Sequence, residues 1–342
     1  MSSVPLRYRF LEACETGDDY EVIALLKRKN KFNLNFENEL PFRSACEGGH
    51  LFIVKLLLEI DGRKRVNTHV HDEYAFRLAC AKGHIDVVEL LLSLEGDRRV
   101  NVHVNGELAL RDTCDAGQKK IFKLLLSLKG DRYIDIHAMN DRAFVRACSS
   151  GHYDIVKIFL SPFSDRFMGV SCESGGHKGF LEACRYGHIE IVKLFLTLDG
   201  ERYVDVHYFR ELAFRETCRR RHLELIKLFL SLKGDRRVNV HAGQDDVMKT
   251  ACVYGFFNVI KILLNLRGDR VFTISETLYW AYPWLEGIVK ENLRCYISHW
   301  YDYRVRSRRG MRLRSEGVFY KIFGGLPRVC FAELVRQLEP CR

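Results

Sequence analysis

The apolar positions of the chain recur in blocks about 34 residues apart, and each block contains two short helical patterns. In one block, a first pattern runs from Tyr74 to Cys80 and a second from Ile85 to Leu92. The second pattern is apolar on nearly every side, which predicts a helix buried between its neighbours. Its one charged position recurs at Lys55, Glu89, Lys123, Lys157, Lys193, Lys227 and Lys261. Each unit is therefore predicted to fold as helix, turn, helix and loop.

The cysteines mark the same period. Of the 12 in the chain, eight fall at one repeating position, at Cys14, Cys46, Cys80, Cys114, Cys148, Cys184, Cys218 and Cys252. One such unit cannot bury its apolar faces alone, and stacking of units supplies the missing contacts. We expect an all-α repeat solenoid of about eight to nine repeats. A buried cysteine in every unit indicates core packing in a reducing compartment and not a single nucleophile.

The loop between units has its own pattern, seen from Gly96 to His103. Gly96 is placed to adopt a left-handed conformation where the preceding helix ends. The alternating Val-Asn-Val-His segment that follows is typical of a short extended strand. We therefore predict that each loop projects as a hairpin-like finger.

These motifs resemble the ankyrin repeat family over about residues 6–272. Ala79-Cys80 is similar to the family's Ala-Ala pair, Gly83-His84 to its Gly-His and Val100-Asn101 to its loop end. Arginine replaces the family's helix-start histidine at Arg43, Arg77, Arg111 and Arg215. The divergent style is similar to ankyrin proteins of large DNA viruses. Tetratricopeptide repeats share the period, but their Trp, Leu-Gly, Tyr and Pro positions are missing.

The pattern predicts a repeat array over residues 1–293. The array has an irregular joint near 161–178, where Pro162 is expected to stop a helix early, and a degenerate last repeat at 273–293. The joint is interpreted as a tolerated loop variant, with a flexible joint between two blocks as the alternative. Residues 294–342 form a basic, aromatic C-terminal region.

Histidines and charges recur with the repeat. Turn histidines stand at His50, His84, His152, His188 and His222, and loop histidines at His69, His103, His137, His207 and His241. Equivalent positions on stacked helices lie about 8–10 Å apart, too far for one zinc ion, so a role in bonding backbone is predicted. Adjacent Asp and Arg residues in the loops, such as Asp97 and Arg98, are interpreted as a solvated, mutually screened edge. We predict no catalytic residue, metal or cofactor.

The resemblance implies that partners meet the finger tips and the two positions after the Ala-Ala pair on each first helix. These two positions are small or mixed in charge in the N-terminal units and become Arg and Tyr after the irregular joint. The predicted partner-binding residues on the concave surface are Arg185, Tyr186, Tyr208, Phe209, Arg210, Arg219, Arg220 and Tyr254. Arginine and tyrosine are enriched at interface hot spots. The first hypothesis is therefore a non-enzymatic scaffold for a protein partner, one that presents acidic or apolar side chains.

Two alternatives arise from the C-terminal region. Residues 294–321 carry +6 of the net charge of +10, with interleaved tyrosines that suit nucleic-acid binding. The end of the chain resembles the start of an F-box, which implies an adaptor that recruits a ubiquitin-ligase subunit. The residues of this adaptor helix, within 326–338, are Leu326, Pro327, Phe331, Leu334 and Leu338.

The chain shows neither a signal peptide nor an apolar run of the length needed to span a membrane. We therefore expect an intracellular, cytoplasmic monomer. The basic region also allows a nuclear address, and a viral origin would place the protein in the host cytoplasm.

Overall fold

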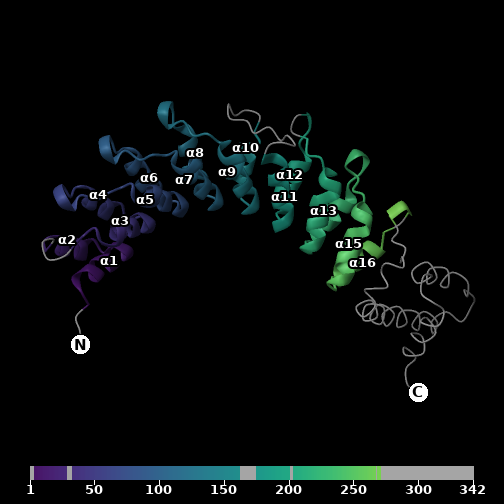
Figure 1. The fold of residues 1–342 in the computed structure, drawn as a ribbon, viewed down its shortest axis with the longest axis horizontal. Helices are drawn as coiled ribbons and strands as arrows, with labels where there is room; N and C mark the ends of the chain where they lie inside the picture. The colour runs from purple at the N-terminus through teal and green to yellow at the C-terminus, as the bar shows by residue number, and fades with distance from the viewer. Residues whose placement is uncertain (1–3, 29–32, 162–174, 201–202, 267, 271–342) are drawn as a thin grey trace, which may run out of the picture. The chain divides into compact units, whose positions relative to one another are not determined.

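The structure is a computed structural model that describes residues 4–28, 33–161, 175–200, 203–266 and 268–270. The described residues form eight helix pairs in two compact units, Met1–Val204 and Asp205–Arg342, which we describe separately (Figure 1). This confirms the predicted all-helical repeat array. The degenerate repeat at 273–293 and the C-terminal region at 294–342 lie outside the described residues.

The first unit contains six pairs. They are α1 (Leu6–Thr16) with α2 (Asp19–Leu26), α3 (Phe36–Gly48) with α4 (Leu51–Leu58), α5 (Val70–Lys82) with α6 (Ile85–Leu92), α7 (Val104–Asp115) with α8 (Lys119–Ser127), α9 (Ala138–Ser149) with α10 (Tyr153–Phe159), and α11 (Gly175–Tyr186) with α12 (Ile189–Leu196). The odd-numbered helices contact one another in sequence and form one layer, and the even-numbered helices form the second.

The second unit contains the pairs α13 (Tyr208–Arg219) with α14 (Leu223–Ser231) and α15 (Ala242–Val253) with α16 (Phe257–Leu264). Again α13 packs on α15 and α14 on α16. In every pair a tight turn joins the two helices at one end, and the loop to the next pair leaves from the other end. Each helix pair therefore presents a turn end and a loop end.

The core lies between the layers and repeats with the sequence. Ala79 and Cys80 on α5 are completely buried, as are the corresponding residues of α3 and α9. The second helix of a pair also buries apolar side chains, four of them on α4 (Ile53, Val54, Leu57 and Leu58) and three on α8. All described cysteines of the repeating series whose side chains are defined are buried, which confirms their predicted packing role.

The loops differ from the predicted extended fingers. Between α6 and α7 the chain forms the 3-10 helix η3 (Gly96–Arg98), and equivalents are η2 (Gly62–Lys64), η4 (Gly130–Arg132), η6 (Gly234–Arg236) and η7 (Gly268–Arg270). Gly96 is left-handed as predicted (φ +66°), although it begins η3 instead of ending α6. Val100 and Val102 are buried, and no strand occurs in the described residues. Burial of these valines anchors the loop against the helices.

The helix that follows the irregular segment packs unusually closely on its neighbour. Gly175 donates its backbone N–H to the Asp141 carboxylate on α9 at 2.5 Å. A Cβ at Gly179 would lie 2.7 Å from the Phe144 ring and 2.9 Å from the Cys148 sulfur. The glycines of α11 thus allow the backbone to approach α9 where other repeats place side chains. None of the described helices has the length and apolarity needed to cross a membrane.

Candidate partner-binding surface

Most polar side chains that repeat along the chain are used to join neighbouring repeats. An acid near the start of six first helices, buried in all of them except α15, shows this most clearly. The helices α3, α5, α7, α9, α13 and α15 each contain three successive left-handed residues, and the third is acidic: Glu39, Glu73, Glu107, Asp141, Glu211 and Asp245. Sequence reasoning missed these acids, although they recur every 34 residues from Glu39 to Asp141.

The acid is bonded both within its own repeat and to the next one. Glu73 accepts a hydrogen bond from His69 Nδ1 at 2.6 Å and another from the backbone N–H of Asn101 at 3.1 Å. His69 Nε2 lies 2.7 Å from the carbonyl oxygen of Asp97. A carboxylate and a carbonyl oxygen both accept hydrogen bonds, so the two contacts favour the imidazolium cation, which donates from both ring nitrogens. The hydrogen bond to Glu73 accordingly raises the pKa of His69.

The same arrangement is found at two other loop histidines. Its members are His103 with Glu107 and the Asp131 carbonyl, and His207 with Glu211 and the Asp235 carbonyl. The hydrogen bond to Glu107 raises the pKa of His103. At His207, burial lowers the pKa, but the hydrogen bonds to Glu211 and to the Asp235 carbonyl outweigh it and the pKa is raised. These loop histidines therefore have the predicted structural role.

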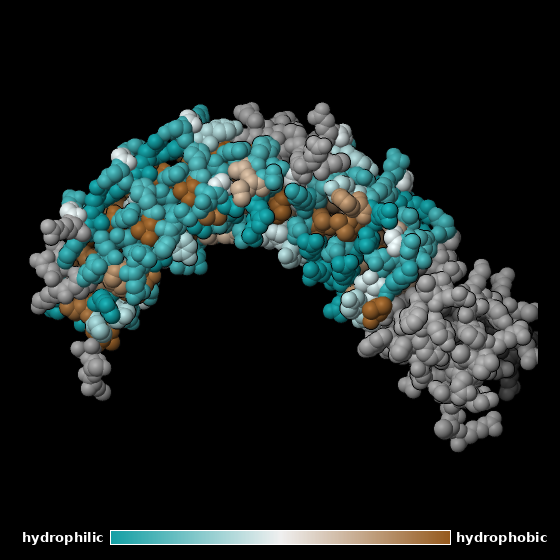
Figure 2. Space-filling view, viewed as in Figure 1, coloured by the Kyte–Doolittle hydropathy of each residue, from teal (hydrophilic) through white to brown (hydrophobic). Residues whose placement is uncertain are grey.

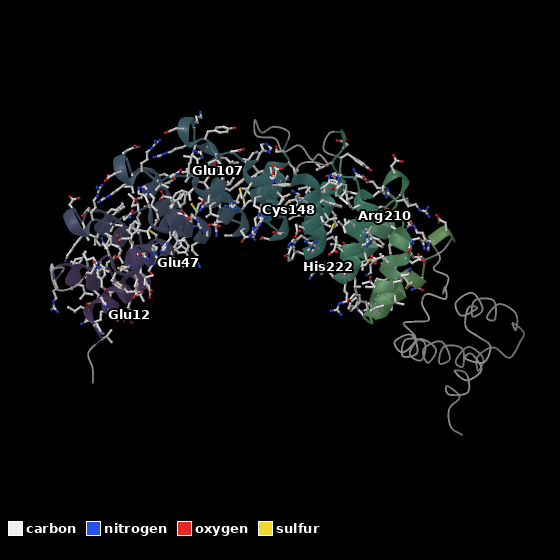
Figure 3. All side chains as sticks on the ribbon, viewed as in Figure 1. Glu12, Glu47, Glu107, Cys148, Arg210 and His222 are labelled. Carbon is white, nitrogen blue, oxygen red and sulfur yellow. The ribbon has the colours of Figure 1, made fainter. Side chains whose placement is uncertain are left out.

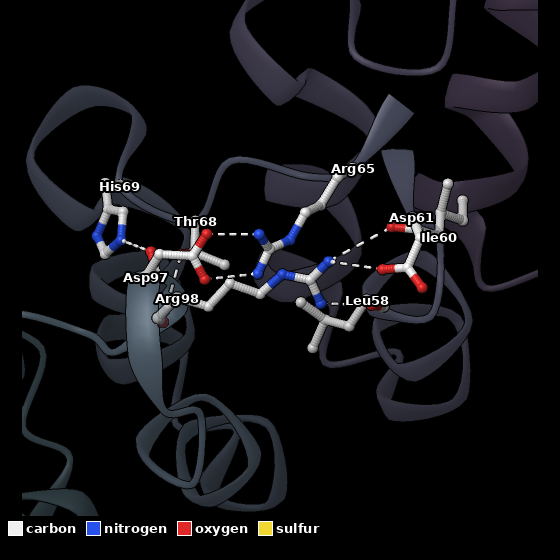
Figure 4. A network of polar contacts seen from close by, with 8 residues as sticks. All are labelled: Leu58, Ile60, Asp61, Arg65, Thr68, His69, Asp97 and Arg98. Atoms are coloured by element: carbon white, nitrogen blue, oxygen red, sulfur yellow. Dashed lines mark hydrogen bonds and ion pairs between the residues drawn. The ribbon is translucent and has the colours of Figure 1, made fainter. Parts of the chain in front are cut away.

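The interpretation of Asp97 and Arg98 as a mutually screened pair is wrong (Figure 4). Asp97 accepts two hydrogen bonds from Arg65 of the preceding loop, at 2.5 and 2.7 Å. Arg98 points the other way and donates to the carbonyl oxygen of Leu58, at the end of α4, at 2.5 Å. A guanidinium satisfies carbonyls left open at a helix end and opposes the helix dipole. The adjacent charges thus serve two different inter-repeat contacts.

The turn ends of the helix pairs are joined by what we call the glycine–histidine clasp. His84 Nε2 donates to the carbonyl oxygen of Glu47, in the preceding repeat, at 2.8 Å. Its ring then covers Gly49, where an added Cβ would lie 2.3 Å from His84 Nδ1. Equivalent pairs are Gly17 with His50, Gly117 with His152 and Gly151 with His188, and Gln118 takes the place of the histidine over Gly83. This confirms a backbone-bonding role for these turn histidines.

The repeated thiols and histidines show no chemistry of a catalytic centre in the described part of the chain. Burial raises the pKa of the Cys14 thiol to about 12 and also raises the thiol pKa values of Cys46, Cys80, Cys114, Cys148 and Cys218. A buried, protonated thiol is a poor nucleophile. Within the described ranges, no group of three or more His, Cys, Asp or Glu side chains is arranged to hold a metal ion.

The predicted partner-binding residues fall in both units. In the first unit, Arg185 and Tyr186 end α11. Arg185 forms an ion pair with Glu182 at 2.6 Å, and the Tyr186 ring stacks on His188 with centroids 6.4 Å apart. Tyr186 remains 57% exposed. It therefore presents an aromatic face at the turn end, held by the clasp histidine.

In the second unit, the predicted residues separate into two groups. Tyr208, Phe209 and Arg210 begin α13 at its loop end, and Arg219 and Arg220 lie at its turn end (Figure 3, which labels Arg210). The regular helical part of α13, residues 212–219, lies between the two groups and at 1.5 Å per residue is about 12 Å long. The structure therefore brings each group together locally but does not join the two.

The loop-end group is an exposed aromatic pair. The Tyr208 and Phe209 rings meet edge to face with centroids 4.7 Å apart. Phe209 is 68% exposed and left-handed (φ +48°), a conformation that bulky residues rarely adopt. Met139 holds the equivalent position in the first unit and is also exposed.

The turn-end group combines the basic end of α13 with aromatic residues at the end of α15. Tyr254 is 68% exposed, and its ring stacks on Phe256 at a centroid distance of 5.7 Å. The Arg221 guanidinium lies over the Phe256 ring, 5.3 Å from its centroid. Figure 2 shows a mostly hydrophilic surface with several separate hydrophobic areas, one of them near the end of α15. Sequence reasoning missed Arg221 and Phe256, although they replace the usual glycine and histidine of the turn.

The fold and these contacts define a class of protein: a stacked array of paired helices held together by polar contacts between successive repeats. A family model for ankyrin repeats in three copies matches residues 10–102 and 76–168, and this part of the chain is an array of ankyrin repeats. The match describes a repeat and not a catalytic domain, and it does not support a viral origin. No match was found among the curated proteins. The adaptor residues predicted at 326–338 and the basic stretch at 294–321 lie outside the described residues.

Proposed function

We propose that this ankyrin repeat protein is a non-enzymatic, intracellular scaffold that binds a protein partner through the exposed aromatic and basic residues of its C-terminal repeats. Ankyrin repeats in general support protein–protein interaction. The observation that carries the proposal is a change at one structural position, the turn end of the first helix. There Ala81 and Lys82 in one repeat correspond to Arg219 and Arg220 in another and to Val253 and Tyr254 in the last described one.

Their exposure supports a binding role. Tyr186, Phe209 and Tyr254 each expose more than half of their surface, and none of them is needed to fill the core. Large aromatic residues beside arginines are the residue types that contribute most to protein interfaces. In the array, the buried acids, loop histidines and clasp histidines already hold the repeats together. The exposed residues at the turn and loop ends are therefore available for a partner.

Position-specific photocrosslinking tests the proposal. A photoreactive phenylalanine analogue would replace Tyr186, Phe209 or Tyr254 in the full chain, with Tyr20 on α2 as the control because it is 88% exposed. After irradiation in a cell lysate, crosslinked proteins are identified by mass spectrometry. We expect the same protein from at least one of the three sites and not from Tyr20. Equal crosslinking from Tyr20 would contradict the proposal.

The same experiment separates the two alternatives drawn from the C-terminal sequence. Recovery of ligase subunits that is lost when Leu326 and Phe331 are changed to alanine would favour an adaptor. Crosslinking to nucleic acid, with strong dependence on salt, would favour a nucleic-acid binder.

A further inference from the structure

One junction in the second unit departs from the glycine–histidine clasp at both of its positions. The residue that follows the end of the first helix is left-handed, and it is glycine at Gly17, Gly49, Gly83, Gly117, Gly151, Gly187 and Gly255. Within the described repeats, the exception is Arg221, which has φ +61°. The residue that would cover it from the next repeat is Phe256, where a clasp would have histidine.

The two replacements fit each other. A side chain at the glycine position would collide with a clasp histidine, as the 2.3 Å approach at Gly49 shows. A phenyl ring has no N–H, so Phe256 cannot make the hydrogen bond that His84 makes to the carbonyl oxygen of Glu47. In its place, the Arg221 guanidinium lies over the Phe256 ring at 5.3 Å. The junction has thus exchanged a backbone hydrogen bond for a cation on an aromatic face.

An arginine in the left-handed region is strained where glycine is not. The exchange adds charge and aromatic surface at one place. Arg219, Arg220 and Arg221 follow one another, and Val253 and Tyr254 are 57% and 68% exposed beside them.

The charges of this cluster are only partly neutralised. Arg219 pairs with Glu216 on its own helix at 3.2 Å. For Arg220 and Arg221, no carboxylate lies within ion-pair distance among the residues that the structure describes. A guanidinium offers a planar pair of N–H donors that matches a carboxylate. The cluster therefore carries two cations ready for an acidic group.

We propose that Arg219, Arg220, Arg221, Val253, Tyr254 and Phe256 form a docking site for an acidic segment of the partner protein. Carboxylates of that segment bind Arg220 and Arg221, and a neighbouring apolar side chain packs on Val253 and Tyr254. This inference rests on the proposed function and specifies the chemistry of its partner.

An acidic polypeptide fits this surface better than a nucleic acid does. Affinity for nucleic acid comes mainly from phosphate contacts, and proteins that depend on it make about six to ten of them. Here three arginines lie at one helix end, and one of them is already paired with Glu216. Phe256 is covered by Arg221 on one side and stacked on Tyr254, so base stacking would have to displace these contacts.

Fluorescence anisotropy with the full chain tests the proposal. The probes are fluorescein-labelled dodecamer peptides in which glutamates flank one leucine or one tyrosine. Glutamine versions of the same peptides and a labelled thymidine dodecamer are the comparison probes. At about 0.1 M salt, we expect the glutamate peptides to bind at least about tenfold more tightly than the glutamine peptides or the thymidine dodecamer do.

Two variants remove the site without unfolding the repeat. Arg221→Gly is expected to weaken peptide binding about tenfold. Combining Arg221→Gly with Phe256→His rebuilds a clasp. This double variant should bind the peptide no more tightly than Arg221→Gly alone, and its melting temperature should equal or exceed that of the wild-type chain. The matched control is Lys227→Gln with Lys233→Gln, which removes two charges from α14 and the loop that follows it. It should change affinity less than about twofold.

Several outcomes would overturn the inference. They are wild-type affinity in the rebuilt-clasp variant, equal weakening by the lysine control, and tighter binding of the thymidine dodecamer that depends on Arg221. The two failures can be told apart. If Phe209 or Tyr254 crosslinks a partner and the arginine variants retain it, the scaffold stands and the acidic docking site is wrong. Equal crosslinking from Tyr20 would instead contradict the proposed function itself.

Discussion

The glycine–histidine clasp makes a quantitative prediction about Gly49. In Gly49→Ala, the methyl group would lie 2.3 Å from His84 Nδ1, and the backbone there has φ +75°. The left-handed alanine costs about 1 kcal/mol. Displacing the ring costs about another 1–1.5 kcal/mol, because the 2.8 Å hydrogen bond from His84 to the Glu47 carbonyl is lost. We expect a total destabilisation of about 2–2.5 kcal/mol.

A double-mutant cycle isolates the coupling. His84→Ala alone loses the same hydrogen bond, at about 1–1.5 kcal/mol. The double variant has the strain of the left-handed alanine and lacks the hydrogen bond, and each cost is counted once. Its destabilisation should therefore stay at about 2–2.5 kcal/mol, about 1–1.5 kcal/mol less than the sum of the two single variants. Gly62→Ala is the matched control, because Gly62 is also left-handed (φ +71°) but a Cβ there meets nothing within 4 Å. It should cost only the strain, about 1 kcal/mol.

The measurement is urea denaturation followed by circular dichroism, together with native-state hydrogen exchange. Because repeat arrays can unfold in parts, hydrogen exchange of peptides from α3 to α6 gives the local free energy. Strict additivity of the two single substitutions, within about 0.5 kcal/mol, would refute the claim that the His84 ring excludes a side chain at position 49. Equal costs for Gly49→Ala and Gly62→Ala would do the same.

Three further predictions concern other parts of the repeat. His69, His103 and His207 have raised pKa values in the folded chain, so their stabilisation is complete below about pH 6.5 and is lost as the pH rises through the folded pKa. The urea concentration at the unfolding midpoint should therefore decrease as the pH rises from about 6.5 to 8. Replacing all three histidines by glutamine should make this concentration depend less on pH. Arg98→Met should cost about 1–3 kcal/mol through loss of the bond to the Leu58 carbonyl, seen as faster hydrogen exchange at the end of α4. Alkylation at neutral pH, mapped by mass spectrometry, should leave Cys80 unmodified until urea is added, because burial raises its pKa.

The helix pairs could be predicted from the sequence because they depend on periodic burial. Every fully buried position of α4, such as Ile53 and Val54, is apolar in the sequence, and the cysteine at the repeating position marks the tightest packing of the first helix. Such features need only the pattern within one repeat. Period and apolarity therefore predicted the array without any knowledge of side-chain contacts.

The polar contacts between repeats were not predicted, and the reason is geometric. Asp97 and Arg98 are adjacent in sequence, yet Asp97 bonds Arg65 and Arg98 bonds the Leu58 carbonyl. Sequence adjacency suggested that they cancel each other, whereas the 3-10 helix η3 turns them toward different elements of the preceding repeat. Glu73 was missed for a similar reason, since its burial depends on three left-handed residues that do not include glycine.

The partner-binding role of the candidate surface stays a prediction, and the structure bears only on where its residues lie. The change from small to aromatic and basic residues singled out Tyr254 and Arg219, but one continuous patch was expected in which finger tips and helix ends lie together. In the second unit, the order of α13 places Arg210 at the loop end and Arg219 at the turn end. The sequence shows whether a residue lies at the loop end or at the turn end of its helix. That these ends form two separate surfaces depends on how the loop packs, and in the loop after α6 the side chains of Val100 and Val102 are buried.

The local nature of the clasp explains how one junction can carry a binding site. Each clasp joins a repeat only to its neighbour, and in repeat proteins stability is approximately a sum of such nearest-neighbour terms. Replacing the clasp by Arg221 and Phe256 therefore alters one junction and leaves Gly49–His84 and its equivalents in the first unit unchanged. The pair must change together, because an arginine beneath a clasp histidine would collide with the ring and a phenylalanine over a glycine would lose the hydrogen bond without gaining a cation. A coupled replacement at a single junction, in a chain that otherwise repeats the clasp, is what selection for a surface property at that place would produce.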